Sequence, residues 1–346
     1  MTDLNAEKPP EQLTLQQIKL QLQSTNPFER FNAVLYLKDM QTPEVNDLLK
    51  TIINKDPDYI VCELALLLLF NKQDKQLFEI VKHLFFDTSE HRYLRARAIW
   101  IAGKLQTKEA YQILLKALND TSEEVKYWAI IGLQNYNFKS ILDQLLKLLT
   151  SSRSQMIRRA VIWLLGKVQV RPARVALEKT LQQDTTATNR MLAAWALHRI
   201  KAIESIQVLC RALEKESFEL AKREIVFAIG NILQHHLSRK EEIEGFEKIK
   251  DIAVRILSRT LLRDQSYIVR RVCAEALGKL TDPRTVPNLV EILGTDTNPF
   301  VRREIILSLG KIGDPSVKEA LKSAKKSNYK IVSEAAYQAL QKLREN

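Results

Sequence analysis

The stretch YIVRRVCAEALGKLTDPRTVPNLVEIL starts at Tyr267, and GTDTNPFVRREIILSLGKIGDPSVKEALKSA follows it directly and ends at Ala324. Both segments carry one design, displaced by 32 residues: Val-Arg-Arg at residues 269–271 and 301–303, then a helical pattern, then an Asp-Pro turn. A second amphipathic pattern closes each segment. A short unit written twice in this way predicts a stack of helix pairs, in which each pair buries its apolar face against its neighbours.

The rest of the chain repeats this unit in degenerate form. We number each unit from the usually apolar residue before the basic pair, which is position zero. Position zero falls at Glu29, Val61, Leu94, Val125, Ile157, Asn189, Ala221, Val269, Val301 and Val332. Successive spacings are 31 to 33 residues, except for 48 between Ala221 and Val269. Positions zero, four, seven, eight and eleven share one helix face and predict a core stripe.

An acid or a serine stands five residues before position zero in every unit. These residues are Ser24, Asp56, Ser89, Asp120, Ser152, Asp184, Glu216, Asp264, Asp296 and Ser327. All except Glu216 are good N-cap types, whose side-chain oxygen accepts a backbone N–H at the start of a helix. We therefore predict a helix boundary at this position in each unit.

This repeat resembles the HEAT-repeat family, in the short-unit variety also found in phycobilisome (bilin) lyases. The resemblance implies an all-α fold: an α-solenoid, or superhelix, of about ten HEAT-like helix pairs, with the second helices lining a concave surface. We expect residues 1–12 to be a disordered tail and 13–346 to be a single solenoid. The long spacing predicts an insertion at about 234–250, either a helix extension with a surface loop or a contact element that overhangs the groove.

Composition bounds the class of protein and its partners. The net charge of +12 suits either a well-solvated surface or an acidic partner. Cys62, Cys210 and Cys273 lie far apart, which fits a reducing compartment and no disulfide framework. No apolar run is long enough to cross a bilayer, and residues 1–12 lack the pattern of a secretion signal. We expect a cytoplasmic protein.

Motifs for catalysis are missing from the sequence. It contains no glycine-rich phosphate loop, no Gly-x-Ser-x-Gly and no zinc spacing, so we assign no catalytic residue and no metal ligand. Deoxyhypusine hydroxylases are similar in fold and hold di-iron with His-Glu dipeptides. This sequence has no such dipeptide, which argues against that activity.

A basic residue recurs at position one in eight of the ten units. These residues are Arg30, Arg95, Lys126, Arg158, Arg190, Lys222, Arg270 and Arg302. One interpretation is a positive stripe for phosphate or carboxylate groups. The other, which we favour, is a structural ladder in which the arginines pair with acids in adjoining turns, as the family resemblance implies.

A second recurring set predicts a groove on the second helices. Positions two and six point away from the core stripe. Position six is apolar in the first seven units, whereas position two is mostly apolar in the first half of the chain and arginine-rich in the second. The candidate partner-binding residues are Leu35, Leu67, Trp100, Tyr127, Ile131, Trp163, Trp195 and Phe227, and the basic end is Arg159, Arg223, Arg271 and Arg303. The alternative is that these rings pack between adjacent repeats.

Three functions fit this pattern. The first is a non-enzymatic interaction scaffold or assembly factor that binds a helical, acidic protein partner and needs no cofactor. The second, implied by the resemblance, is a bilin lyase or chromophore-handling protein, which would hold a bilin and work as a hetero-oligomer. The third is a nucleic-acid-binding HEAT-like protein, because the chain is basic. A large face without a catalytic set favours the first.

Overall fold

The computed structural model describes residues 13–136, 139–239 and 242–345, so the predicted tail at 1–12 lies outside the described residues. The described residues contain twenty α-helices, six short 3-10 helices and no strand. This confirms the predicted all-α class and the ten helix pairs. The contacts divide the chain into two compact units, Met1–Ser140 and Ile141–Asn346. A single solenoid over both units stays a prediction.

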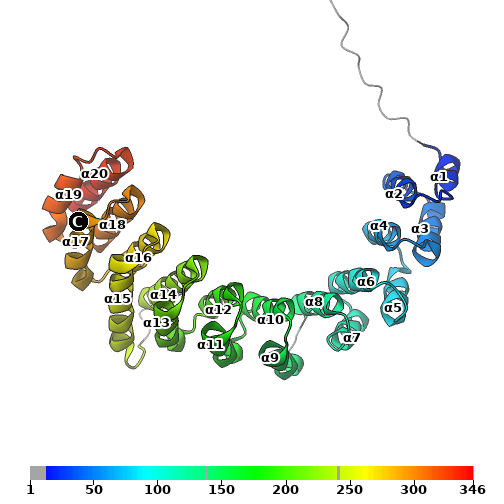
Figure 1. Cartoon of the computed structure of the whole chain (residues 1–346), viewed down its shortest axis with the longest axis horizontal. Helices are drawn as coiled ribbons and strands as arrows, with labels where there is room; N and C mark the ends of the chain where they lie inside the picture. Colours follow the sequence, from blue (N-terminus) through cyan, green and yellow to red (C-terminus); the bar gives the residue numbers. More distant parts are fainter. Residues whose placement is uncertain (1–12, 137–138, 240–241, 346) are drawn as a thin grey trace, which may run out of the picture. The chain divides into compact units, whose positions relative to one another are not determined.

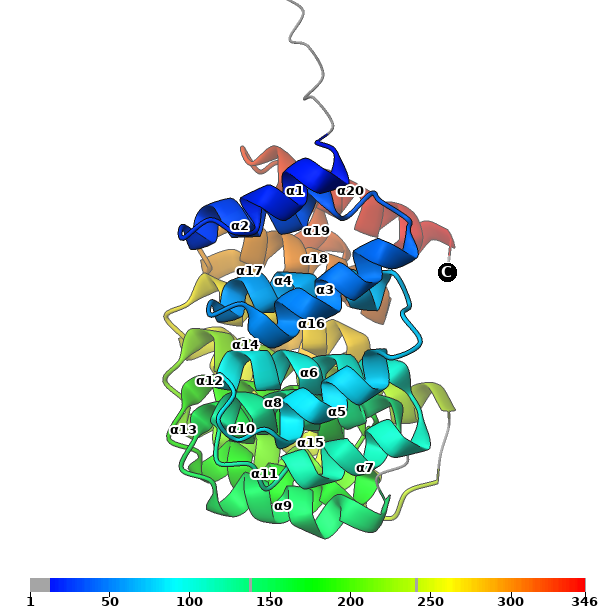
Figure 2. The same cartoon turned by 90° about the vertical axis from the view of Figure 1, so that its right-hand side faces the viewer.

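The first unit holds four helix pairs. In chain order they are α1 (Leu15–Gln21), α2 (Pro27–Tyr36), α3 (Pro43–Lys55), α4 (Tyr59–Asn71), α5 (Leu77–Phe86), α6 (Arg92–Leu105), α7 (Lys108–Ala117) and α8 (Glu123–Gly132), with η1 (Leu133–Asn135) after them. Each even-numbered helix packs on the next even-numbered one and on its own odd-numbered partner. The helices of this unit, blue to cyan, therefore form two layers (Figures 1 and 2).

The second unit holds six helix pairs in the same arrangement. They are η2 (Lys139–Ile141), α9 (Leu142–Ser151), α10 (Gln155–Lys167), α11 (Arg174–Gln183), α12 (Ala187–Arg199), α13 (Ile206–Lys215), α14 (Glu219–Arg239), α15 (Phe246–Arg263), α16 (Tyr267–Leu280), α17 (Val286–Thr295), α18 (Pro299–Ile312), α19 (Lys318–Ala324) and α20 (Lys330–Glu345). Within this unit the even-numbered helices lie on the inner side of a curved row and the odd-numbered helices on the outer side (Figure 1).

Position minus five is a helix boundary at Asp56 and Asp184, but it ends the first helix and is not the N-cap of the second. The N-cap is position minus three, for example Ser154 before α10, whose hydroxyl accepts the N–H of Ile157. Asp184, at position minus five, is instead the C-cap of α11, and its carboxylate accepts the N–H of Thr186. Aspartate favours both settings, because each uses the same short side chain to accept a backbone N–H two or three residues on.

Glycine at position nine lets adjacent even-numbered helices approach closely. A Cβ added to Gly103 would lie 2.6 Å from the Cα of Gly132 on the next even-numbered helix. A Cβ on Gly278 would lie 2.4 Å from the Oγ of Ser308, and one on Gly310 would lie 3.0 Å from the Cβ of Ala339. The small residue opposite is at position seven each time, so this seam is a repeated packing rule.

The predicted insertion lengthens two helices. It extends the end of α14 and the start of α15, which is preceded by Gly245 at φ 71 in the left-handed region that glycine adopts easily. His236 of α14 is buried, and its Nε2 lies 3.2 Å from the carbonyl oxygen of Lys201. Residues 240–241 lie outside the described ranges. The described part agrees with the helix extension.

Asp282 precedes η5 (Pro283–Thr285) in an Asp-Pro turn, and its carboxylate contacts Lys250 in the extended start of α15. The pKa of this carboxylate gives a pH prediction. Hydrogen bonds from Arg284 lower the pKa of Asp282 to about 2, and Nζ of Lys250 lies 3.4 Å from its carboxylate. Because the folded pKa is depressed, the stabilisation is complete above about pH 4 and is lost as the pH falls through about 2. We expect Asp282→Asn to lower the free energy of unfolding by about 1–2 kcal/mol at neutral pH.

Denaturant unfolding of the wild type and Asp282→Asn at several pH values measures this contribution. We expect the difference in unfolding free energy to shrink toward zero at about pH 2, where the wild-type carboxylate is itself protonated. A difference that does not change with pH would contradict the electrostatic assignment.

Candidate functional site

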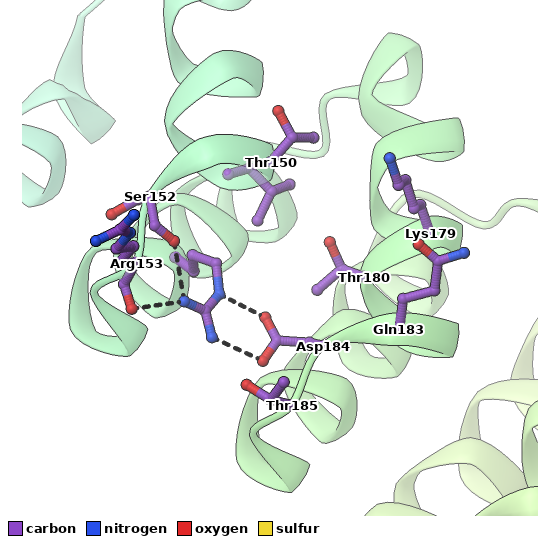
Figure 3. Close-up of a pocket in the computed structure, with 10 residues that line it drawn as sticks. Thr150, Ser152, Arg153, Lys179, Thr180, Gln183, Asp184 and Thr185 are labelled. Atoms are coloured by element: carbon purple, nitrogen blue, oxygen red, sulfur yellow. Dashed lines mark hydrogen bonds and ion pairs between the residues drawn. The ribbon is translucent and has the colours of Figure 1, made fainter.

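The first arginine of each basic pair is held inside the repeat array. Nε of Arg158 on α10 donates to Oδ2 of Asp184 at 2.7 Å, and its Nη2 donates to Oδ1 at 3.0 Å. Its Nη1 donates to the carbonyl oxygens of Ser152 and Arg153. The bonds meeting at Asp184 are drawn in Figure 3. Burial would raise the pKa of Asp184, but these bonds and the N–H of Thr186 outweigh it and lower the pKa.

The same pair joins most neighbouring units. Four further pairs have N–O distances of 2.7–2.8 Å: Arg30–Asp56, Arg190–Glu216, Lys222–Asp264 and Arg270–Asp296. Arg95 also bonds to Asp120, but through Nη1 and Nη2, while its Nε donates to the carbonyl oxygen of Phe85. Thus five of the six arginines in the predicted structural ladder pair with the acid five residues before the next position zero. The sixth, Arg302, has a buried Nε with no partner among the described residues.

The hollows beside these pairs are part of the repeat. The cleft in Figure 3 encloses about 390 Å³ and is lined by Arg158, Asp184 and polar residues from α9 to α11. Similar hollows lie beside Arg30–Asp56, Arg190–Glu216 and Lys222–Asp264. Because the central charges already satisfy each other, we assign these hollows a structural role.

The second basic residue, at position two, has a different environment. Arg159, Arg223 and Arg303 are exposed and Arg271 is half-buried. Nη2 of Arg159 donates to Oγ1 of Thr188 at 3.3 Å. Within the described ranges, none of these four predicted basic-end residues forms an ion pair with an acid within 4.0 Å. Their guanidinium groups remain available to an acidic ligand.

Two of the predicted apolar residues of the second unit stand four residues after one of these arginines on the same helix, Trp163 on α10 and Phe227 on α14. Trp163 and Trp195 are half-buried, and Phe227 is 39% exposed. The ring of Trp195 lies against Gly166 of α10, since a Cβ there would meet the ring at 2.4 Å. Nζ of Lys279 lies 5.0 Å from the Phe227 ring centre. The row therefore packs partly between repeats and is partly open to solvent.

The remaining predicted groove residues lie in the first unit. Leu35 is exposed, and Leu67, Trp100, Tyr127 and Ile131 are half-buried. Trp100 is largely surrounded by its own unit. Its ring meets the Phe70 ring edge-on at 5.7 Å, and the cations of Arg97 and Lys104 lie 5.2 and 5.5 Å from its centre. Each unit is described by itself, so one surface that carries all eight predicted residues stays a prediction.

A third row escaped the sequence prediction. Position ten, four residues after position six on the same helix face, is basic in six of ten units. The residues are Lys104, Lys167, Arg199, Lys279, Lys311 and Lys342. The 32-residue spacing that revealed the other rows is the signal that would have found this one.

The described residues show no catalytic set. In 13–136, 139–239 and 242–345, no group of three or more His, Cys, Asp and Glu side chains could hold a metal ion. Burial raises the pKa of the Cys62 and Cys210 thiols to about 12 and also raises that of Cys273, so these thiols stay protonated. No helix in these ranges is long and apolar enough to cross a bilayer.

Comparison with known sequences identifies the repeat. The family model described as HEAT repeats matches residues 75–140, 142–230 and 254–341. Human deoxyhypusine hydroxylase is 37% identical over 81 residues, which cover 23% of this chain and 27% of that protein. The bovine protein is 34% identical over 93 residues, 27% of this chain and 30% of its own length. The chain thus spans less than a third of the length of these curated relatives.

Comparison with solved structures shows the fold. A Kap95p chain from a structure of its complex with RanGDP aligns with 95% of this chain and 48% of its own length, at a TM-score of 0.65 and 11% identity. The CpcE–CpcF phycocyanin lyase of Nostoc sp. PCC7120 aligns with 77% of this chain and 94% of its own length, at 0.39 and 15%. The first likeness supports the α-solenoid fold.

Proposed function

Because the chain belongs to the HEAT-repeat family, we propose that it is a non-enzymatic protein-interaction scaffold, whose second unit binds an acidic, helical segment of a protein partner. One observation carries the proposal. In the basic pairs of α10, α14, α16 and α18, the second residue is an arginine that forms no ion pair in the described structure, and on α10 and α14 it stands four residues before Trp163 and Phe227 of the apolar row. Unpaired arginines beside aromatic rings are typical of residues that dominate protein interfaces.

The related folds are consistent with this role. Kap95p, which shares the fold, binds RanGDP. The deoxyhypusine hydroxylase relatives are enzymes, but they match only a fraction of this chain, and it lacks the His-Glu dipeptides of that class. Among the described residues, no cluster of His, Cys, Asp and Glu side chains could hold a metal ion in place of those dipeptides. A scaffold role uses the features that are present.

Capture from native lysate with a matched pair of variants tests the proposal. Arg223→Glu/Arg303→Glu reverses two exposed charges at position two. Arg211→Glu/Lys318→Glu reverses two exposed charges on the odd-numbered helices α13 and α19. We expect the first variant to lose the partner that the wild type and the second variant retain, with binding by the purified partner weakened about tenfold or more.

The result that would overturn the proposal is equal retention of the same proteins by all three chains. The alternative functions are tested with the same material. Bilin absorbance that appears only on addition of pigment would favour chromophore handling, and steeply salt-dependent binding of DNA would favour a nucleic-acid binder.

A further inference from the structure

We infer that the partner segment is one amphipathic α-helix with acidic residues on both flanks of its apolar stripe, lying across α10 to α18 between two basic rows. This inference rests on the proposed function and adds the form of the partner. The first row is position two: Arg159, Arg223, Arg271 and Arg303. The second row is position ten: Lys167, Arg199, Lys279 and Lys311.

The separation of the two rows matches the width of an α-helix. Positions two and ten of one helix are eight residues apart, which is about 12 Å along the axis, and they share a face. An α-helix with its side chains is about 10–12 Å across. A helix lying across α10 to α18 therefore places one flank along each basic row.

The floor between the rows is mostly apolar. Position six supplies Trp163, Trp195, Phe227 and Leu307 on four of the five helices. The fifth supplies Glu275, whose carboxylate pairs with Lys279 at 2.8 Å. We expect the apolar stripe of the partner helix to cover most of this floor, and the partner residue opposite Glu275 to be neutral or basic.

The spacing of the floor residues sets the repeat of the partner. Adjacent even-numbered helices pack tightly, because a Cβ on Gly166, Gly230 or Gly278 would lie within 3.0 Å of the next one. Packed helices lie about 8–10 Å apart, which is about five to seven residues of a helix crossing them. Four such steps give a partner helix of about 21–27 residues, with an apolar anchor about every two turns.

The charge of this face selects an acidic partner. The two rows place eight basic side chains beside the floor, where Glu275 is the acid at position six. Glu304, at position three, is 7% exposed. Burial and the charge of Glu275 raise its pKa, and the charges of Lys311, Arg271 and Arg303 lower it in part, with a net rise. A partner helix with glutamates on both flanks can pair with both basic rows, whereas a partner with one charged edge can pair with only one of the rows.

Designed probes test the inference directly. The first probe is a labelled peptide of about 21 residues with three heptads, leucine at the a and d positions and glutamate on both flanks. The second has lysine in place of every glutamate, and the third is oligothymidylate of about 20 nucleotides. Fluorescence anisotropy measures the binding of each probe to the full chain.

Three variants separate the two rows. They are Arg223→Glu/Arg303→Glu in the first row, Lys167→Glu/Lys311→Glu in the second row, and the outer control Arg211→Glu/Lys318→Glu, all at exposed positions. We expect the wild type to bind only the acidic peptide, each row variant to lose about tenfold or more in affinity, and the control to change less than about twofold.

Other outcomes overturn the inference in distinguishable ways. If only the first-row variant weakens binding, the two-row arrangement fails and the proposed function stands. If the wild type does not bind the acidic peptide, yet the first-row variant loses the captured protein partner, the two-flanked form of the partner helix fails and the proposed function again stands. If oligothymidylate binds and the peptide does not, both are overturned.

Discussion

Replacement of Asp184 with alanine is expected to lower the free energy of unfolding by about 3–5 kcal/mol, because it strands a buried charge. The side chain of Asp184 is 3% exposed and that of Arg158 is 13% exposed. Asp184 also accepts hydrogen bonds from the Thr186 N–H and from Nδ2 of Asn189. Denaturant unfolding followed by circular dichroism measures the loss.

Two control variants identify the cause. Arg158→Met/Asp184→Leu removes both charges and is expected to cost well below the single change, because apolar residues of similar volume can replace a buried pair. Thr185→Ala changes an exposed neighbour and is expected to stay within about 0.5 kcal/mol of the wild type. A loss below about 1 kcal/mol for Asp184→Ala would show that the pair is solvated.

Gly103→Leu is the second change with a large expected effect. We expect overpacking between α6 and α8 to lower the free energy of unfolding by about 3 kcal/mol. A Cβ at Gly103 meets the backbone of Gly132 at 2.6 Å, and backbone cannot rotate away as a side chain can. The two helices would have to move apart along their whole contact. Thermal and denaturant unfolding of the variant measure this cost.

Gly294→Leu is the matched control for the same substitution. Gly294 also lies in a helix, α17, but a Cβ there has no neighbour within 4 Å. Leucine should stabilise that site by about 0.5–1 kcal/mol, because glycine is a poor helix former. Equal effects at the two positions would refute the close-packing account of position nine.

The sequence predicted the features that depend on repeat spacing. Arg270 and Arg302 repeat with the acids at Asp264 and Asp296, and this spacing, together with the amphipathic pattern and the resemblance to HEAT repeats, led to the helix pairs. The N-cap interpretation of position minus five was wrong, because Asp184 caps the end of α11 by bonds that resemble those of an N-cap. An aspartate accepts a nearby backbone N–H both at the start and at the end of a helix, and only the path of the backbone distinguishes the two positions.

The character of the tryptophan row depends on the residue opposite, which the spacing does not reveal. The ring of Trp195 can pack against α10 because the residue opposite it is Gly166. The ring of Trp100 instead contacts the Phe70 ring and two cations. The division into two units was also not predicted, since the repeats before and after Ser140 follow the same spacing. Periodicity fixes the face of a helix but not the neighbours that cover it.

The offset of the ion pairs makes the chain modular. Five of the six arginines at position one bond to the carboxylate of the acid that opens the following repeat, and Arg190 and Arg270 also bond to the backbone carbonyl of the acid that opens their own. Asp184 and Glu216 are 32 residues apart and both meet such an arginine, Arg158 and Arg190. Excision of residues 184–215 would therefore join Arg158 to Glu216 in the same register. Whole repeats could be lost or duplicated during evolution while every new joint kept a matched pair of charges.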